Sequence, residues 1–488
     1  MQDQKEAPIV MKLAQNRKAL NERIGVEQSF DLGFRTVYIL GSEVNVYYVT
    51  GLVETPIIVD IMRQLFELNE GTEEEDTVSS RIKNDIPHQQ VETSSDMNQC
   101  ITQLLSGLIV LFVEGETDAF IVDVRTYPGR TPEEPDTEKV IRGSRDGFTE
   151  NIIENTALTR RRIRDERLRH EILQVGERSK TDVCISYIKD VADPGLVDLI
   201  KSEIKNIDID GLSMADKTVE EFLVKQGSNP FPLVRYTERP DVASAHLFEG
   251  HVIIMVDTSP SVIITPTTYF HHVQHAEEFR QAPAVGTFVR WVRFFGIFSS
   301  IFVLPLWMLF VMQPDLLPES LAFIGPNEET SIPIIIQILL ADLGLEMLRI
   351  AAIHTPTPLS TAMGLIAAVL IGQIAIDVGM FVPEVILYVA VAAIGSYSTP
   401  SYELSVANKM ARVLFVILVA VFGIKGLMIG FLGFILLLAH TKSLNTPYLW
   451  PFLPFNAKAA LQIIFRLSMP SLKVRPSVVH PQNNQRQK

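Results

Sequence analysis

A succession of long, uncharged apolar runs in the C-terminal part of the chain limits most strongly what it can fold into. The first run, residues 294–312, contains no Asp, Glu, Lys, Arg or His. A helix needs about 20 apolar residues to cross a hydrocarbon core of ~30 Å. We therefore predict a polytopic α-helical membrane domain at residues 286–440, with about five to six hydrophobic segments. The other apolar runs cover residues 331–348, 359–376, 381–397 and 413–439.

The charges are divided unevenly between this block and the rest of the chain. The formal net charge is −14, but the segment from residue 281 onward carries 13 Lys+Arg and 9 Asp+Glu, which leaves 30 basic and 48 acidic residues in the first 280. An acidic head does not suit nucleic acid, because phosphates are bound by basic side chains. Arg290 and Arg293 precede the first run, and the tail is basic, so the positive-inside rule predicts a cytoplasmic head and tail.

Short runs rich in β-branched and aromatic residues alternate with helical patterns in the head. Residues 251–256 and 262–266, for example, predict a hairpin. Because strands occur both in hairpins and next to helices, we predict an α/β cytoplasmic head of two mixed-sheet subdomains. We expect a polar leader without a core of its own at residues 1–30. The predicted subdomains cover residues 31–139 and 140–285, and a basic cytoplasmic tail covers residues 441–488.

The cysteine content and the N-terminus fit a head in a reducing compartment. Cys100 and Cys184 are the two cysteines of the chain, too few for a disulfide framework or a cysteine metal cluster. The first 20 residues lack the apolar stretch and small-residue cleavage site of a signal peptide. We therefore expect the head to stay in the cytoplasm.

Charged residues interrupt the second apolar run. Asp342, Glu346 and Arg349 are separated by four and three positions, so they lie on one face of a helix. Each charge in the middle of a membrane helix costs ~2.5–3.5 kcal/mol on insertion scales. Two interpretations remain open: an internal ion pair that fixes packing, or a face that borders an ion pathway or a subunit contact.

The third and last runs are irregular in other ways. The third carries small residues at helical spacing, which permits either close helix packing or a narrow pore. Gln373 and Asp377 follow at its mouth. The last run is too long for one span, and we expect it to break around Gly423, Lys425 and Gly426 into two helices, which keeps the tail inside. The small residues of the third run are Gly364, Ala367, Ala368 and Gly372.

Other patterns in the head suggest no catalysis. His271, His272 and His275 have a spacing that a metal site could use, but amphipathic segments near membranes often carry histidine. Asp257 resembles one half of an aspartic-protease site, which needs a second carboxylate. The arginine-rich run at 160–169 fits a neighbouring acidic subdomain or subunit better than a phosphate. We find no phosphate-binding glycine motif, and we expect no catalytic residue, cofactor or metal, and no enzymatic activity.

Several stretches together resemble the GerA family of spore germination proteins, the membrane A subunits of germinant receptors. Residues 257–260 read Asp-Thr-Ser-Pro, where receptor A subunits more often have glycine second. This departure and residues 262–275 are more similar to the paralogous branch associated with the SpoVA group. The matching residues are 143–148 (GSRDGF), Asn155, 158–162 (LTRRR), 236–241 (YTERPD), 249–250 (EG), 257–260, Leu348, Arg349, Ala351, Gly372, Gln373, Pro447, Tyr448 and Pro451.

The resemblance implies a protein of the inner membrane of a bacterial endospore that acts in germination. It implies a homo-oligomeric ion channel that promotes or amplifies germination, together with a small membrane partner protein and other germination proteins. Two alternatives stay open: a non-conducting scaffold, and a receptor A subunit that senses a nutrient. A membrane enzyme that uses Asp257 is a weaker third hypothesis.

Overall fold

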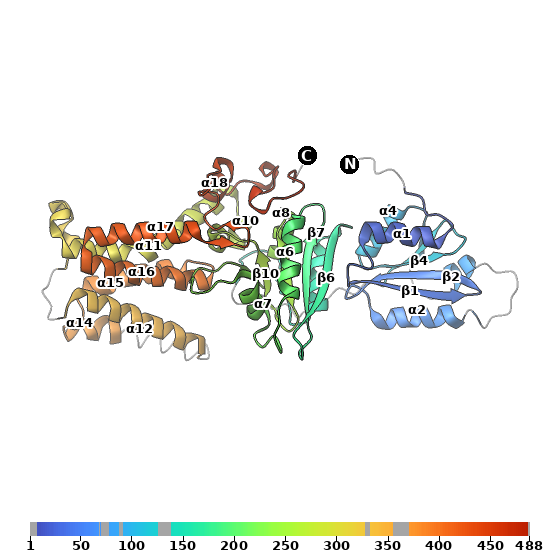
Figure 1. Ribbon diagram of the computed structural model, residues 1–488, viewed down its shortest axis with the longest axis horizontal. Coiled ribbons are helices and arrows are strands. Elements are labelled where there is room, and N and C mark those ends of the chain that lie inside the picture. The colour runs from blue at the N-terminus through green and yellow to red at the C-terminus, as the bar shows by residue number, and fades with distance from the viewer. Residues whose placement is uncertain are drawn as a thin grey trace. The chain divides into compact units, whose positions relative to one another are not determined.

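The computed structural model describes residues 7–67, 69, 78–86, 91–124, 138–326, 332–354 and 370–486 (Figure 1). Its contacts divide the chain into two compact units. The first, here called the head unit, comprises Met1–Gln226, Val234–Pro266 and Met469–Lys488. The second, the helical unit, comprises Gly227–Leu233 and Thr267–Ser468. The head unit therefore contains segments from both sides of the helical unit in the sequence.

The first half of the head unit is a five-stranded sheet covered on both faces. Its strand order is β1-β2-β4-β5-β3. Side chains of α1 and α4 pack in a core on one face of the sheet, and side chains of α2 and α3 pack in a core on the other. In Figure 1, α1 and α4 lie on one side of this sheet and α2 lies on the other. The elements are α1 Leu13–Ile24, β1 Leu32–Ile39, β2 Ser42–Val49, α2 Thr55–Glu67, α3 Val78–Asp85, β3 Val91–Ser94, α4 Met97–Leu105, β4 Ile109–Val113 and β5 Ala119–Val122.

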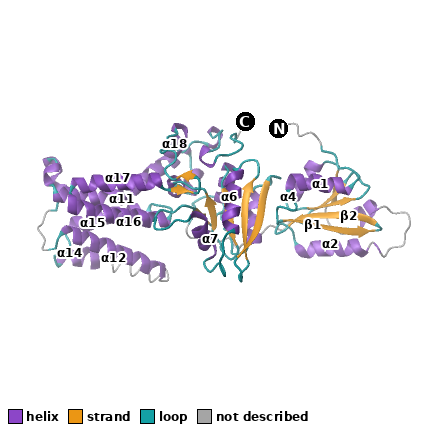
Figure 2. Ribbon diagram, viewed as in Figure 1, coloured by secondary structure: helices purple, strands orange, loops and turns teal. Residues whose placement is uncertain are grey.

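The second half of the head unit repeats this arrangement element by element. Its strand order, β6-β7-β9-β10-β8, is the order of the first sheet with every strand renumbered by five. Two copies of one topology thus make up the head unit (Figure 2). The elements are α5 Ile152–Arg162, β6 Leu168–Val175, β7 Thr181–Ile188, α6 Pro194–Lys205, α7 Ala215–Val224, β8 Arg235–Thr237, α8 Pro240–Glu249, β9 Val252–Val256 and β10 Val262–Thr265.

The prediction of two α/β subdomains is confirmed, but the prediction of mixed sheets is wrong. Every described pair of strands in the two sheets is antiparallel. Four strands of each sheet form two hairpins, β1–β2 and β4–β5 in the first and β6–β7 and β9–β10 in the second. The fifth strand, β3 or β8, pairs antiparallel with β5 or β10 at the edge of its sheet. Helices between strands do not by themselves require parallel pairing.

The predicted leader is largely part of the first subdomain. Residues 13–24 form α1, which ends at Gly25 in the left-handed region, φ 69°. Leu13, Leu20 and Ile24 are buried in the core beneath it. The contribution of this segment to a core was not predicted, because its four buried positions are spread among polar residues.

A buried ion pair joins the two subdomains. The Arg160 Nε donates to Asp31 Oδ2 at 3.0 Å, and neither side chain is more than 1% exposed. The backbone N–H of Phe30 donates to the His170 carbonyl at 3.0 Å, and Ala157 of α5 belongs to the core of the first subdomain. Burial alone would raise the pKa of Asp31, but the charges of Arg160 and His170 and the hydrogen bonds from Arg160 and Ser29 together lower that pKa overall.

The last residues of the chain fold against the second subdomain rather than forming a free tail. The Gln482 amide donates to the Ala192 carbonyl at 2.6 Å, and the Arg475 Nε donates to the Phe248 carbonyl at 2.7 Å. Val478 and Val479 are buried. Because both segments that flank the helical unit belong to one folded head, any membrane crossings between them must be even in number.

The helical unit consists mainly of apolar helices. By length and composition, two described helices are candidates to cross a membrane, α11 Pro283–Met312 and α16 Tyr402–Phe422. Two further apolar helices are shorter, α15 Pro383–Tyr397 and α17 Ile424–His440. The remaining elements are α9 Tyr269–Val273, α10 Ala276–Arg280, η2 Pro314–Leu316, η3 Glu319–Ile324, α12 Ile334–His354, η4 Leu370–Ile374, α14 Ala375–Asp377, β11 Lys442–Ser443, β12 Thr446–Pro447 and α18 Ala457–Ile464.

The last apolar run contains a break at Gly423. This residue has φ 58° and ψ −136°, which glycine adopts without strain, and it separates α16 from α17. Gly426 and Gly430 of α17 face Leu418 and Phe415 of α16, so the two helices run antiparallel. Lys425 lies in the first turn of α17.

Replacing Arg160 with Met is expected to destabilise the head unit by about 3–5 kcal/mol, because Asp31 would stay buried without its counter-ion. Arg167→Met is the matched control, since Arg167 pairs with Asp165 and Asp190 at the surface and its loss should cost at most ~1 kcal/mol. Native-state hydrogen exchange of β2 and β7 in the full chain would measure both. Equal effects of the two variants would contradict this account.

The stability of the head unit should fall as the pH falls from about 6.5 toward 4. Burial lowers the pKa of His251 to about 4, and the Arg235 charge adds to this against a hydrogen bond to the Pro266 backbone. In this pH window His251 is protonated in the unfolded chain but neutral in the folded chain. The free energy of unfolding therefore falls by ~1.4 kcal/mol for each unit by which the pH falls. Hydrogen exchange of β9 should show a shallower pH dependence in His251→Gln. An unchanged slope would contradict the assignment.

Candidate functional site

A network of charged side chains lies inside the helical unit between α12 and α16. The Arg412 Nη2 donates to Asp342 Oδ1 at 2.5 Å, and the Lys409 Nζ lies 3.5 Å from the same oxygen. Lys409 also pairs with Glu346 Oε2 at 2.8 Å. Asp342 is 4% exposed and Arg412 is 1% exposed. Two carboxylates from one helix thus meet two cations from another.

Two further contacts extend this network. Arg349 pairs with Glu346 one turn away and stacks over the Tyr402 ring at 4.9 Å. The Arg412 Nη1 donates to the Ser300 carbonyl of α11 at 2.8 Å. Charges removed from water are tolerated when they are paired and hydrogen-bonded, and each of these contacts reduces the cost of burial. The network therefore ties together three helices, α11, α12 and α16.

The structure brings together three of the candidate residues from the sequence, Asp342, Glu346 and Arg349. In the part of the chain that the structure describes, Gln373 and Asp377 are not joined to this network: Gln373 lies in the π-helix η4 with Gly372, and Asp377 ends α14. Gly364, Ala367 and Ala368 lie outside the described residues.

Lys409 and Arg412 were missed as partners, because they lie between the apolar runs at residues 381–397 and 413–439. The structure places both within α16, which begins at Tyr402. A local signal existed: the Ser401 hydroxyl accepts from the Leu404 N–H and caps this helix, as serine often does. Lys409 and Arg412 are three positions apart, which places them on one helical face.

Small residues allow helices α11 and α15 to approach closely. A Cβ on Gly395 would collide with the Gly296 carbonyl, so neither side of this crossing has room for a larger residue. Such small-residue contacts let apolar helices pack backbone to backbone. The contact brings Ser300 and Ser396 near Arg412, because Arg412 Nη1 reaches both.

The histidines and Asp257 have structural roles. The Thr268 N–H donates to His271 Nδ1 at 3.0 Å, and the Glu277 N–H donates to His275 Nδ1 at 3.2 Å, so these two rings cap the starts of α9 and α10. Asp257 accepts from the Ile152 N–H at the start of α5. Among the residues that the structure describes, no group of three or more His, Cys, Asp and Glu could hold a metal ion.

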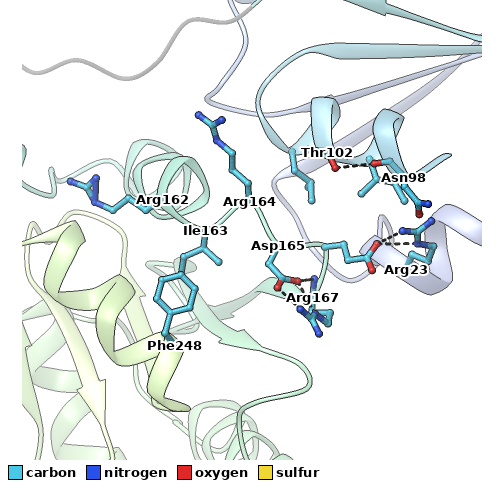
Figure 3. Close-up of a pocket in the computed structure, with 12 residues that line it drawn as sticks. Arg23, Asn98, Thr102, Arg162, Ile163, Arg164, Asp165, Arg167 and Phe248 are labelled. Atoms are coloured by element: carbon cyan, nitrogen blue, oxygen red, sulfur yellow. Dashed lines mark hydrogen bonds and ion pairs between the residues drawn. The ribbon is translucent and has the colours of Figure 1, made fainter. Parts of the chain in front are cut away.

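The arginine-rich run borders a cavity of about 330 Å³ between the two subdomains of the head. Arg23 pairs with Glu166 at 2.7 Å, and Arg167 is bound by Asp165 (Figure 3). Arg162 extends away from Asp165 in Figure 3 and pairs with Asp146. These pairs neutralise much of the positive charge, so the cavity has no strong preference for an anion. The run mainly connects acidic groups of the head, as the sequence suggested.

The comparisons with known proteins assign the chain to a family. The family model described as "Bacillus/Clostridium GerA spore germination protein" matches residues 18–478. The chain therefore belongs to the GerA family of spore germination proteins.

Comparisons with individual proteins show which relatives the chain resembles. The chain is 63% identical over 474 residues to stage V sporulation protein AF of Bacillus subtilis (strain 168), covering 97% of this chain and 96% of that protein. It is 29% identical to the "Uncharacterized membrane protein YfkQ" of the same strain, over 100% of this chain and 95% of that protein. The expected resemblance to the GerA family and its SpoVA branch is confirmed.

One solved structure also aligns with the chain. It is the N-terminal domain of the A subunit of the Bacillus megaterium spore germinant receptor GerK3, at 27% identity and a TM-score of 0.44. The alignment covers 55% of this chain and 99% of that one.

Replacing Arg412 with Met is expected to destabilise the helical unit by about 3–5 kcal/mol, because Asp342 would keep only the longer contact to Lys409. The double variant Asp342→Leu/Arg412→Met should recover part of this loss, since it buries no charge. Thermal unfolding of the full chain in detergent would show both effects. A control, Lys425→Met on the exposed start of α17, should change stability by at most ~0.5 kcal/mol. A double variant no more stable than Arg412→Met would contradict this account.

Proposed function

We propose that the chain is a subunit of a homo-oligomeric ion channel in the spore inner membrane, which promotes or amplifies germination. In this proposal the helical unit crosses the membrane several times, and the head and the C-terminal tail are cytoplasmic. Membership of the GerA family and the likeness to stage V sporulation protein AF support the setting. The protein acts by conduction rather than catalysis, with a small membrane protein and other germination proteins as partners.

The observation that carries the channel proposal is the charged network within the apolar helices. Five ionisable side chains, Asp342, Glu346, Arg349, Lys409 and Arg412, share one network on α12 and α16. Ionisable groups in membrane helices are costly, and they mark ion pathways or moving elements where they occur. Glu346 is the most exposed member, with its side chain 23% accessible, so we place an ion route beside it.

The topology agrees with this orientation. The head unit includes segments before and after the helical unit, which supports a topology with both ends on one side of a membrane. The breaks at Gly423 and between α15 and α16 give successive apolar helices with short connections. Arg290 and Arg293, just before the uncharged part of α11, support the cytoplasm as that side.

A non-conducting scaffold is the second candidate, and one observation favours it. Asp342 and Glu346 each have a basic partner within hydrogen-bonding distance. A network whose carboxylates are all paired with basic side chains can act only to hold the helices together. In that case the helical unit would hold other germination proteins together, as a receptor A subunit also would, and the network would have no influence on ions.

Ion flux through the full chain in liposomes tests the channel. We expect flux in the wild type once it is activated, and in Glu346→Gln a change of about tenfold in the cation-to-anion permeability ratio, equivalent to ~1.4 kcal/mol. Glu319→Gln, on the exposed turn η3, is the matched control and should leave the ratio unchanged. Absence of flux under every activating condition would overturn the channel and favour the scaffold. If Glu346→Gln conducts with an unchanged permeability ratio, the chain forms a channel but its ion route does not pass the charged network.

A further inference from the structure

An apolar surface follows the last helix of the apolar block. Residues 449–467, here called the interfacial segment, contain α18 and the loop before it. Phe455 is 71% exposed and Leu461 is 53% exposed, which is unusual for side chains of this size. Other large apolar side chains of the segment are also exposed: Phe452, Leu453, Phe465 and Leu467.

The segment is held firmly against the first turns of α11. The Arg290 Nη1 donates to the Gln462 carbonyl at 2.8 Å and to the Ile463 carbonyl at 3.0 Å. The Trp291 indole donates to the Ile464 carbonyl at 3.0 Å. Ala460 and Ile463 are buried on this side. The orientation of α18 is therefore fixed, and its opposite face, with Lys458 and Leu461, is presented outward.

The attachment of the interfacial segment to the first turns of α11 determines its depth in the membrane. A helix of 30 residues such as α11 is about 45 Å long, more than the ~30 Å of a hydrocarbon core. Its charged residues, Arg290 and Arg293, precede the uncharged part, so the first turns belong at the level of the headgroups. The exposed side chains of Phe288 and Trp291 continue the apolar surface of the segment onto α11. Tryptophan is typical of this level of a membrane.

The charge of this part of the chain selects the kind of lipid. Residues 441–488 contain no Asp or Glu, and they carry seven Lys and Arg residues. Lys442 and Lys458 are exposed. A segment with exposed apolar and basic side chains and no acid is attracted to anionic phospholipids.

We propose that the interfacial segment lies in the headgroup layer of the cytoplasmic leaflet and binds anionic phospholipid. Phe455 and Leu461 insert about 5–10 Å into the boundary of the acyl chains, and Lys458 faces the lipid phosphates. The segment thereby fixes the height of α11 in the membrane through Arg290. This proposal rests on the membrane location of the helical unit proposed above.

The test uses the full chain in liposomes of phosphatidylcholine with phosphatidylglycerol, labelled with an environment-sensitive fluorophore at one new cysteine. The native Cys100 and Cys184 are buried, and the unsubstituted chain measures any background labelling. Labels at Leu461→Cys and Phe455→Cys should be quenched more by lipid with a shallow nitroxide than by lipid with a deep one. A label at Leu432→Cys, exposed on α17, should show the reverse order. A label at Lys205→Cys, exposed on the head, should not be quenched.

The outcomes separate the two proposals. Quenching at Leu432 without quenching at Leu461 and Phe455 would overturn the interfacial segment and leave the membrane location intact. Self-quenching between labels at Leu461 would instead indicate a contact between copies of the chain, which also overturns it. Absence of quenching at Leu432 would overturn the membrane location itself. Lys458→Glu should reduce the shallow quenching of the Leu461 label when phosphatidylglycerol is present, and a result independent of the lipid charge would overturn the preference for anionic lipid.

Discussion

The cost of removing an ionised side chain from water organises both units of this protein. In the head, Arg160 reaches across to Asp31 and joins two subdomains. In the helical unit, Arg412 reaches from α16 to Asp342 of α12. Near the start of α11, Arg290 and Arg293 meet the buried Glu278. Each pair is buried, and neither partner is stable there alone. These pairs therefore specify which elements must be neighbours, a role that the apolar contacts around them leave open.

The head consists of two subdomains with the same topology, and the C-terminal residues pack against the second of them. Each sheet is covered by helices on both faces and has the same strand order. The second copy receives the C-terminal residues through Gln482 and Arg475. The segments before and after the helical unit therefore belong to one folded body.

The sequence predicted much of this and missed specific parts for physical reasons. Hydrophobic runs located the helical unit and α11, and β-branched runs located most strands of the head. The leader failed as a prediction because the apolar positions of α1 are few, although Leu13 and Leu20 are buried. The direction of strand pairing failed because pairing is non-local. Of the candidate site, Asp342, Glu346 and Arg349 were found through their spacing on one helix, whereas Lys409 and Arg412 were missed because they lie outside the apolar runs.

The sequence by itself determined the division into an acidic α/β head and an apolar helical part, and it determined membership of the GerA family. Composition and periodicity suffice for this division, because each depends on residues close together in the chain, whereas the family is indicated by the matching stretches and shown by the family model. The partners of the buried charges, the identical order of the two sheets and the return of the C-terminal residues to the head were decided by the tertiary structure. Arg412 and Asp342 are 70 positions apart, and no local pattern says which distant carboxylate will neutralise a given cation once both have left water.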